Sequence, residues 1–256
     1  MDCLIFQWSG IRMKLALYFT FPYPDRETFR KFFDETLKFN FEYLELGIPT
    51  DHPYYDGPVI RKTHGKAKEN YSEDMLEEIV KEANSRNIRV YTLVYYNHFV
   101  GREGEFLGKL KSMGFSGAIV PDLLTDYFSE RNLLISEMDK FGMALIPFFT
   151  SSTPDSVIRD IAGKTNGWIY HGLQPSTGIK VPVSTDLIVS RIKELCPGRE
   201  VIFGFGINSK DEIIDLKKSG ADGIAIGSTL VPCMESMDLD CFRSKIRMLE
   251  EGVNGI

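Results

Sequence analysis

The sequence predicts a single α/β domain, a (β/α)8 TIM barrel, from three observations. Eight apolar runs alternate with amphipathic helical stretches, which is the rhythm of a parallel sheet with helical crossovers. The length of 256 residues suits one barrel around one core. Runs such as 144–146 and 223–226 are continuously apolar, as strands buried on both faces are. Because no glycine-rich dinucleotide loop follows the first run, a closed barrel is favoured over an open, doubly wound sheet.

The elements are expected in a regular order. Strands are predicted at residues 15–21, 43–49, 89–96, 117–122, 143–150, 167–173, 201–207 and 223–229. Helices are predicted at residues 25–38, 72–83, 104–113, 155–162, 185–195, 210–219 and 239–249, with a helix expected after every strand. Two longer stretches, 50–70 and 174–184, are predicted to be loops after the second and sixth strands. They would lie on the face where barrel active sites form.

We predict one catalytic domain over residues 13–256. Residues 1–12 carry no clear pattern and are expected to be an N-terminal extension, either a disordered tail or an addition upstream of a natural start at Met13. This segment lacks the basic region and the cleavage site of a signal peptide, and no run reaches the length of a membrane span. The expected protein is therefore cytoplasmic and does not contact membranes.

Charge and composition exclude several classes of partner. The formal net charge is −6 and the basic residues are scattered, so nucleic acid is not expected to bind. The histidines show no ligand spacing such as His-x-x-x-His and there is no Cys-x-x-Cys pair, so no metal is expected. The cysteines are few and irregularly spaced, which predicts free thiols: Cys3, Cys196, Cys233 and Cys241. The expected ligand is a small molecule.

Two glycine-containing strand ends predict a phosphate site. The seventh strand ends in Gly-Phe-Gly-Ile at residues 204–207, and the eighth ends in Gly227-Ser228-Thr229. Glycines let backbone N–H groups converge on an anion, serine adds a donor, and the start of a helix supplies a favourable dipole. Either motif alone is equally consistent with a tight turn, but barrels commonly bind phosphate after strands seven and eight.

A carboxylate within an apolar strand is the strongest candidate for catalysis. Glu45 lies in the run Tyr43-Leu44-Glu45-Leu46-Gly47, where an isolated ionised carboxylate carries a desolvation cost. With a period of two, Glu45 points into the barrel while its two neighbours face the helices. A raised pKa there would suit a general acid and base, although a structural Glu paired to a neighbour remains the alternative.

A second carboxylate lies in the loop that is expected after the same strand. Asp56 stands in Tyr55-Asp56-Gly57-Pro58, where it can face the same ligand as Glu45. Asp-Gly-Pro is also ordinary turn chemistry, so on its own this motif favours a structural role.

Ordered motifs along nearly the whole barrel resemble the tryptophan synthase alpha family. They are Glu45-Leu46-Gly47-Ile48-Pro49, Tyr55-Asp56-Gly57-Pro58-Val59-Ile60, Val120-Pro121-Asp122, Thr177-Gly178, Gly204-Phe205-Gly206 and Gly227-Ser228. The resemblance implies a lyase that cleaves indole-3-glycerol phosphate into indole and glyceraldehyde 3-phosphate by a retro-aldol reaction. Glu45 would shuttle protons between the glycerol hydroxyl and indole C3, and Asp56 would hold the indole N–H.

The resemblance also implies the other binding groups and the partner. Backbone N–H groups at Gly178, Gly206 and Gly227, with Ser228, would bind the phosphate. Tyr170 would line the indole pocket, unless it belongs to the core, and Thr177 would help to fix Asp56 from a closing loop. The family pairs with a tryptophan synthase beta subunit in an α2β2 complex, and the beta subunit carries pyridoxal phosphate, so no cofactor is expected in this chain.

The departures from the family pattern predict a divergent, archaeal-like member. Residues 49–53 read Pro-Thr-Asp-His-Pro, which replaces an acidic residue on the partner-facing loop, and residues 174–178 read Gln-Pro-Ser-Thr-Gly. The alternatives are another phosphate-binding barrel, such as an aldolase or a prenyl-glyceryl phosphate synthase, or a non-catalytic regulatory subunit. A Schiff-base aldolase would need a lysine in a late strand, where this chain has Tyr170 and His171. A regulatory subunit would be expected to lack one of the two carboxylates.

Overall fold

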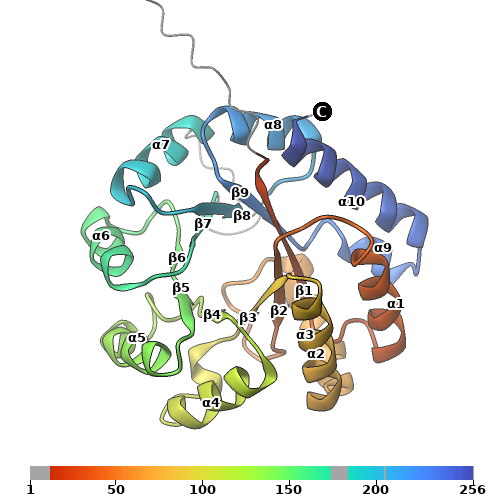
Figure 1. Cartoon of the computed structure of the whole chain (residues 1–256), viewed down its shortest axis with the longest axis horizontal. Helices are drawn as coiled ribbons and strands as arrows, with labels where there is room; N and C mark the ends of the chain where they lie inside the picture. Colours follow the sequence, from red (N-terminus) through yellow and green to blue (C-terminus); the bar gives the residue numbers. More distant parts are fainter. Residues whose placement is uncertain (1–11, 174–183, 205, 256) are drawn as a thin grey trace, which may run out of the picture.

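The protein is a closed barrel of parallel strands inside a ring of helices (Figure 1). The computed structural model describes residues 12–173, 184–204 and 206–255. The strands are β1 Lys14–Thr20, β2 Tyr43–Gly47, β3 Arg89–Leu93, β4 Gly117–Ile119, β5 Ala144–Ile146, β6 Phe148–Phe149, β7 Ile169–Gly172, β8 Val201–Gly204 and β9 Gly223–Ile226. Each of the eight predicted strands is present, and the predicted barrel is confirmed.

The barrel is closed at Pro147, the residue that connects the two end strands of the sheet, β5 and β6. The strand order is β5-β4-β3-β2-β1-β9-β8-β7-β6, so the two outermost strands are consecutive in sequence. Proline has no N–H to donate, which interrupts the fifth predicted strand and divides it into β5 and β6. The Pro147 carbonyl still accepts a hydrogen bond from the Tyr170 N–H at 3.0 Å, which extends the pairing of β6 with β7 to Pro147. The seventh and eighth predicted strands are consequently β8 and β9.

The helices surround the sheet in chain order (Figure 1). They are α1 Arg26–Thr36, α2 Pro58–Asn70, α3 Glu73–Ser85, α4 Glu103–Met113, α5 Arg131–Lys140, α6 Asp155–Lys164, α7 Thr185–Leu195, α8 Lys210–Lys218, α9 Val231–Glu235 and α10 Leu239–Asn254. Polar side chains fix several starts: Asp25, Ser72, Ser209 and Asp238 each accept a hydrogen bond from the first turn of their helix.

The prediction that residues 50–70 form a loop is wrong for more than half of that stretch. Residues 58–70 form α2, which begins with Pro58 at its first turn. Its buried face is Ile60, Thr63, His64 and Ala67, which has helical spacing but two polar members. A search for apolar periodicity misses such a helix because its inward face is not apolar.

Alternation along the strands separates two cores. Leu44 and Leu46 belong to the larger core between the barrel and the helices. Tyr43 belongs to a smaller core inside the barrel, where it stacks on Trp168 with ring centroids 5.6 Å apart. The Tyr43 hydroxyl donates to Glu200 at 2.6 Å and accepts from Arg89 at 3.0 Å. Glu45 therefore faces the barrel interior, as the alternation predicts.

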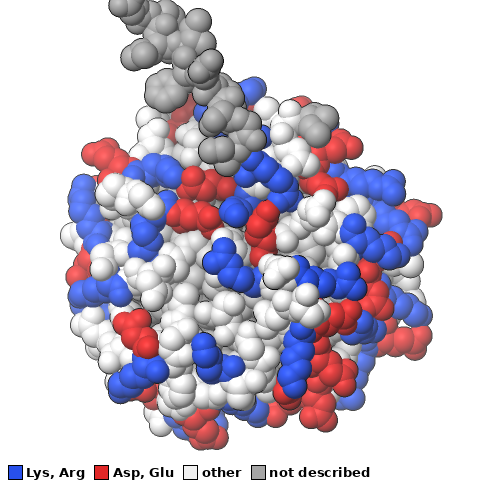
Figure 2. Space-filling model, in the orientation of Figure 1, with Lys and Arg blue, Asp and Glu red and all other residues white. Residues whose placement is uncertain are grey.

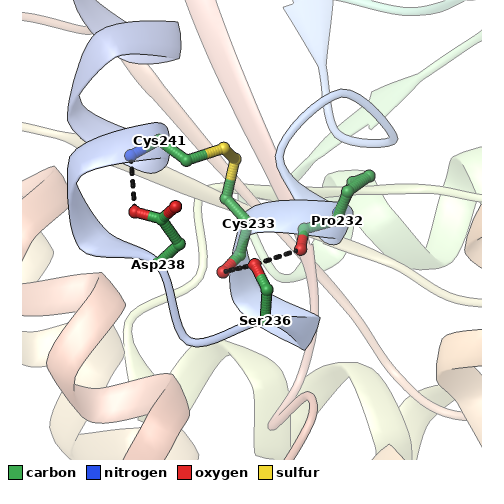
Figure 3. The surroundings of a disulfide bond; sticks show 5 residues. All are labelled: Pro232, Cys233, Ser236, Asp238 and Cys241. Carbon is green, nitrogen blue, oxygen red and sulfur yellow. Dashed lines mark hydrogen bonds between the residues drawn. A yellow bond between two sulfur atoms is a disulfide. The ribbon is translucent and has the colours of Figure 1, made fainter.

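Two of the cysteines expected to be free thiols form a disulfide (Figure 3). Cys233 in α9 and Cys241 in α10 are eight residues apart, and their Cα atoms lie at 5.7 Å. The turn between the two helices brings them together: the Asp238 carboxylate accepts from the Cys241 N–H at 2.9 Å and the Ser236 hydroxyl donates to the Pro232 carbonyl at 2.9 Å. Such proximity depends on the turn and not on a recognisable cysteine spacing. Cys196 is free and buried.

The surface mixes both signs of charge. Figure 2 shows acidic and basic side chains interspersed over the face in view. Within the described ranges, no helix is long and apolar enough to cross a membrane.

Candidate active site

A pocket opens at the carboxyl ends of the strands, the end where barrel enzymes bind their ligands. It contains about 790 Å3 of space not occupied by atoms, counted to its open mouth. Its lining includes Glu45 on β2, Asp56 from the loop after β2, and residues that follow β8 and β9. The remaining lining is largely apolar or aromatic: Tyr18, Tyr55, Val59, Ile60, Leu93, Pro121, Phe148, Tyr170, Ala225 and Ile226. The lining suits a small ligand with one aromatic and one polar part.

Glu45 occupies the apolar side of this pocket. Its side chain is fully buried, and neither carboxylate oxygen accepts a hydrogen bond from the described part of the chain. The neighbouring positions in the sheet are Tyr18 on β1 and Tyr91 on β3. Burial raises the pKa of Glu45 from 4.5 to about 8. A carboxyl group with such a pKa can release and take up a proton near neutral pH, which is the property of a general acid and base.

The carboxylate of Asp56, unlike that of Glu45, accepts hydrogen bonds from other side chains in the described part of the chain. Asp56 ends the loop after β2, directly before the first turn of α2, and is 8% exposed. Its Oδ2 atom accepts hydrogen bonds from the Tyr95 hydroxyl at 3.0 Å and from His64 Nε2 at 3.1 Å. The Tyr95 hydroxyl in turn accepts from the backbone N–H groups of Tyr55 at 3.0 Å and Asp56 at 3.1 Å. These contacts hold the carboxylate in one orientation.

Two tyrosines, Tyr18 and Tyr170, line the pocket, and each occupies space beside a glycine on a neighbouring strand. A Cβ atom at Gly47 would stand 2.3 Å from the Tyr18 hydroxyl, and one at Gly204 would stand 2.2 Å from the Tyr170 hydroxyl. The structure thus places Tyr170 in the pocket wall, beside Phe148 at 5.3 Å between ring centroids. Burial raises the pKa of both tyrosines well above 10, so both remain hydroxyl groups.

The pocket lining also contains the two strand ends that predicted a phosphate site. Gly206, Ile207, Gly227, Ser228 and Thr229 line the pocket there. Gly206 has a φ of 80°, which favours glycine. The Thr229 hydroxyl lies 3.3 Å from the Ile207 carbonyl, which joins the two connections. The described lining contains no lysine, arginine or histidine, so an anion there would be bound by N–H groups and hydroxyls.

The structure brings together Glu45, Asp56, Tyr170, Gly206, Gly227 and Ser228 around one pocket. Thr177 and Gly178 lie outside the described residues. The sequence patterns do not indicate a place in the site for Tyr18, Tyr95 or His64. His64 could have been found from the spacing of Ile60, His64 and Ala67, had residues 58–70 been interpreted as a helix.

No metal cluster accompanies these groups: among the residues that the structure describes, no three His, Cys, Asp or Glu side chains are placed to hold an ion.

Known proteins are similar to this chain in sequence and in fold. The family model described as the tryptophan synthase alpha chain matches residues 9–253. The chain is 32% identical over 225 residues to the tryptophan synthase alpha chain of Sulfurisphaera tokodaii, with 88% of this chain and 91% of the relative covered. It is 30% identical over 237 residues to that of Saccharolobus solfataricus, with 93% and 94% covered. A solved tryptophan synthase complex from Pyrococcus furiosus matches with a TM-score of 0.80 and 25% identity over 96% of this chain and 99% of that one. The chain therefore belongs to the tryptophan synthase alpha chain family.

Proposed function

We propose that the protein is the alpha subunit of tryptophan synthase, a lyase that cleaves indole-3-glycerol phosphate into indole and glyceraldehyde 3-phosphate. One observation carries this proposal: a fully buried carboxyl group with a pKa of about 8 faces the same pocket as a fixed carboxylate and two glycine-containing strand ends. The substrate has a matching distribution of groups, with an indole ring, a glycerol hydroxyl and a phosphate.

Glu45 moves the proton in this reaction. Cleavage breaks the bond between indole C3 and the adjacent glycerol carbon, whose hydroxyl becomes the aldehyde carbonyl. The hydroxyl loses a proton and indole C3 gains one, so the reaction balances without an oxidant or reductant. A single group that accepts the first proton and donates the second is sufficient, and a pKa of about 8 suits both steps near neutral pH.

Asp56 stabilises the positive charge that develops on the indole ring when C3 is protonated. Its described side-chain hydrogen bonds both end on Oδ2. Oδ1 is then the oxygen that accepts the indole N–H. Because this carboxylate is oriented before substrate arrives, little reorganisation is needed during the reaction.

The phosphate binds at the ends of β8 and β9. Backbone N–H groups at Gly206 and Gly227 and the Ser228 hydroxyl supply the donors, with Gly178 as a further proposed contact. The proposed role of Thr177 is to help fix Asp56. Tyr170 contacts the indole ring. A site composed of N–H groups distinguishes a phosphate dianion by geometry and dipole rather than by a cationic side chain.

A beta subunit with pyridoxal phosphate is the proposed partner, in an α2β2 complex in the cytoplasm. Pyridoxal phosphate chemistry belongs to that subunit, so this chain uses no cofactor of its own. A Schiff-base aldolase would need a lysine in the pocket, and no lysine is present among the described lining residues.

The test is indole release from indole-3-glycerol phosphate by the purified protein, followed spectroscopically with and without a matching beta subunit. We expect indole in both conditions, with faster release in the complex. No indole in either condition would contradict the proposed reaction and favour a regulatory subunit or another barrel enzyme.

A further inference from the structure

We propose that His64 is a positioning residue for this reaction, acting through Asp56; the inference rests on the proposed function. His64 lies on the inward face of α2, one turn after Ile60, and is 1% exposed. Its ring contacts two groups of the connection after β2: the Thr50 backbone N–H at 3.1 Å and Asp56 Oδ2 at 3.1 Å. The ring therefore spans the loop after β2, from the Thr50 backbone near its start to the Asp56 carboxylate near its end.

The contact with Thr50 determines where the imidazole proton lies. A backbone N–H can only donate, so the Nδ1 atom that it reaches must be an acceptor and carries no proton. The proton of the neutral ring is then on Nε2, the atom that faces Asp56. The loop backbone thus selects the tautomer that donates to the carboxylate.

The second donor to Asp56 is the Tyr95 hydroxyl, and backbone N–H groups determine its orientation as well. The Tyr95 hydroxyl accepts the N–H groups of Tyr55 and Asp56, which directs its own hydrogen to Asp56 Oδ2. Two donors with predetermined directions on one oxygen fix the rotation of the carboxylate group. Oδ1 is left for the proposed contact with the indole N–H. No lysine or arginine side chain within the described ranges is bonded to this carboxylate; Arg61 binds the Asp56 backbone carbonyl instead, at 2.7 Å.

A purely structural histidine would give a different result on mutation. If His64 only fills space, a substitution should reduce the fraction of folded enzyme and leave the kinetic constants of the folded fraction unchanged. If it positions Asp56, the loss should appear in kcat, because the oriented carboxylate matters most when charge develops on the ring.

Two substitutions separate the two contacts of the ring. In His64→Gln the amide nitrogen can take the place of Nε2, so the donor to Asp56 is kept. In His64→Asn the amide oxygen can take the place of Nδ1, so the acceptor for Thr50 is kept but the side chain is too short to reach Asp56. His52→Gln is the matched control. His52 lies in the loop between β2 and α2, which also carries Asp56, but it is exposed and contacts Tyr54.

Indole release and thermal unfolding of the purified variants supply the kinetic test. We expect His64→Asn to lower kcat about tenfold or more with a small change in KM, and His64→Gln to retain most of the wild-type kcat. His52→Gln should match the wild type. Equal kcat values in the two His64 variants, or a loss in His64→Asn explained by unfolding, would overturn the proposal.

A 15N NMR spectrum of the wild-type imidazoles provides a readout that does not depend on activity. We expect the His64 proton on Nε2; a proton on Nδ1 would overturn the proposed orientation. If the wild type released no indole, the proposed function would fail, while the tautomer would still be determined.

Discussion

At the scale of residues, the pocket contains two carboxyl groups with different surroundings and different proposed tasks. Glu45 is buried without a hydrogen-bond partner in the described part of the chain, which raises its pKa to about 8. Asp56 accepts two hydrogen bonds on Oδ2. A site that separates two such groups can use one as a proton carrier and the other as a fixed charge.

The first prediction concerns the effect of Glu45 on stability. Its pKa is about 8 in the folded protein, against 4.5 ordinarily. Between these values the folded state holds a proton that the unfolded chain has released, so the free energy of unfolding falls as the pH rises through this window. The loss is on the order of a few kcal/mol, and Glu45→Gln should avoid it.

Denaturant unfolding of the wild type and of Glu45→Gln at about pH 5 and about pH 8 checks this prediction. The variant should be more stable relative to the wild type at the higher pH. A difference in unfolding free energy that is the same at both pH values would contradict a raised pKa for Glu45.

The orientation of Glu45 could be predicted from sequence because strand alternation alone determines it. The hydrogen-bond network around Asp56 could not be predicted from the sequence. It depends on His64 and Tyr95, which are 8 and 39 residues away in the chain, and on a loop that directs backbone N–H groups to both side chains.

At the scale of elements, the connections after β2, β8 and β9 form most of the pocket. The two described glycines of the proposed phosphate site, Gly206 and Gly227, are required for different structural reasons. Gly206 has a positive φ, and a Cβ atom at Gly227 would lie 2.7 Å from the Tyr18 ring. Replacing either by alanine would strain the backbone or displace Tyr18, so neither change tests phosphate binding cleanly.

Ser228 offers a cleaner test of that site. Ser228→Ala removes one hydroxyl donor and leaves the backbone N–H groups in place. We expect KM for indole-3-glycerol phosphate to rise about tenfold, because a hydrogen bond to a charged group is lost, with a smaller change in kcat. Steady-state kinetics measure both constants. An unchanged KM would argue against phosphate binding at the end of β9.

Element boundaries show where sequence patterns lose information. The predicted strands and the helices for which bounds were predicted agree with the structure within a few residues. The helix α5 was expected after the fourth strand without bounds, and α2 was missed because Thr63 and His64 make its buried face polar. The disulfide between α9 and α10 was also missed, since it follows from a turn that no spacing rule describes.

At the scale of the whole molecule, the barrel brings Glu45 on β2 and the residues after β8 and β9 to one pocket. β1 lies between β2, which carries Glu45, and β9, which leads to Gly227 and Ser228. Its residue Tyr18 packs against Gly47 on one side and Gly227 on the other. Glu45, the proposed proton carrier, and the proposed phosphate site are thus joined by continuous sheet, and the proposed substrate would span them.

The central claim is that Glu45 carries the proton, and Glu45→Gln tests it most directly. The substitution keeps the size and shape of the side chain but cannot shuttle a proton at neutral pH. Indole release should fall about a hundredfold or more, while the dissociation constant for a non-cleavable phosphorylated analogue, measured by calorimetry, should stay near that of the wild type. Turnover equal to that of the wild type, in a folded variant, would contradict the mechanism.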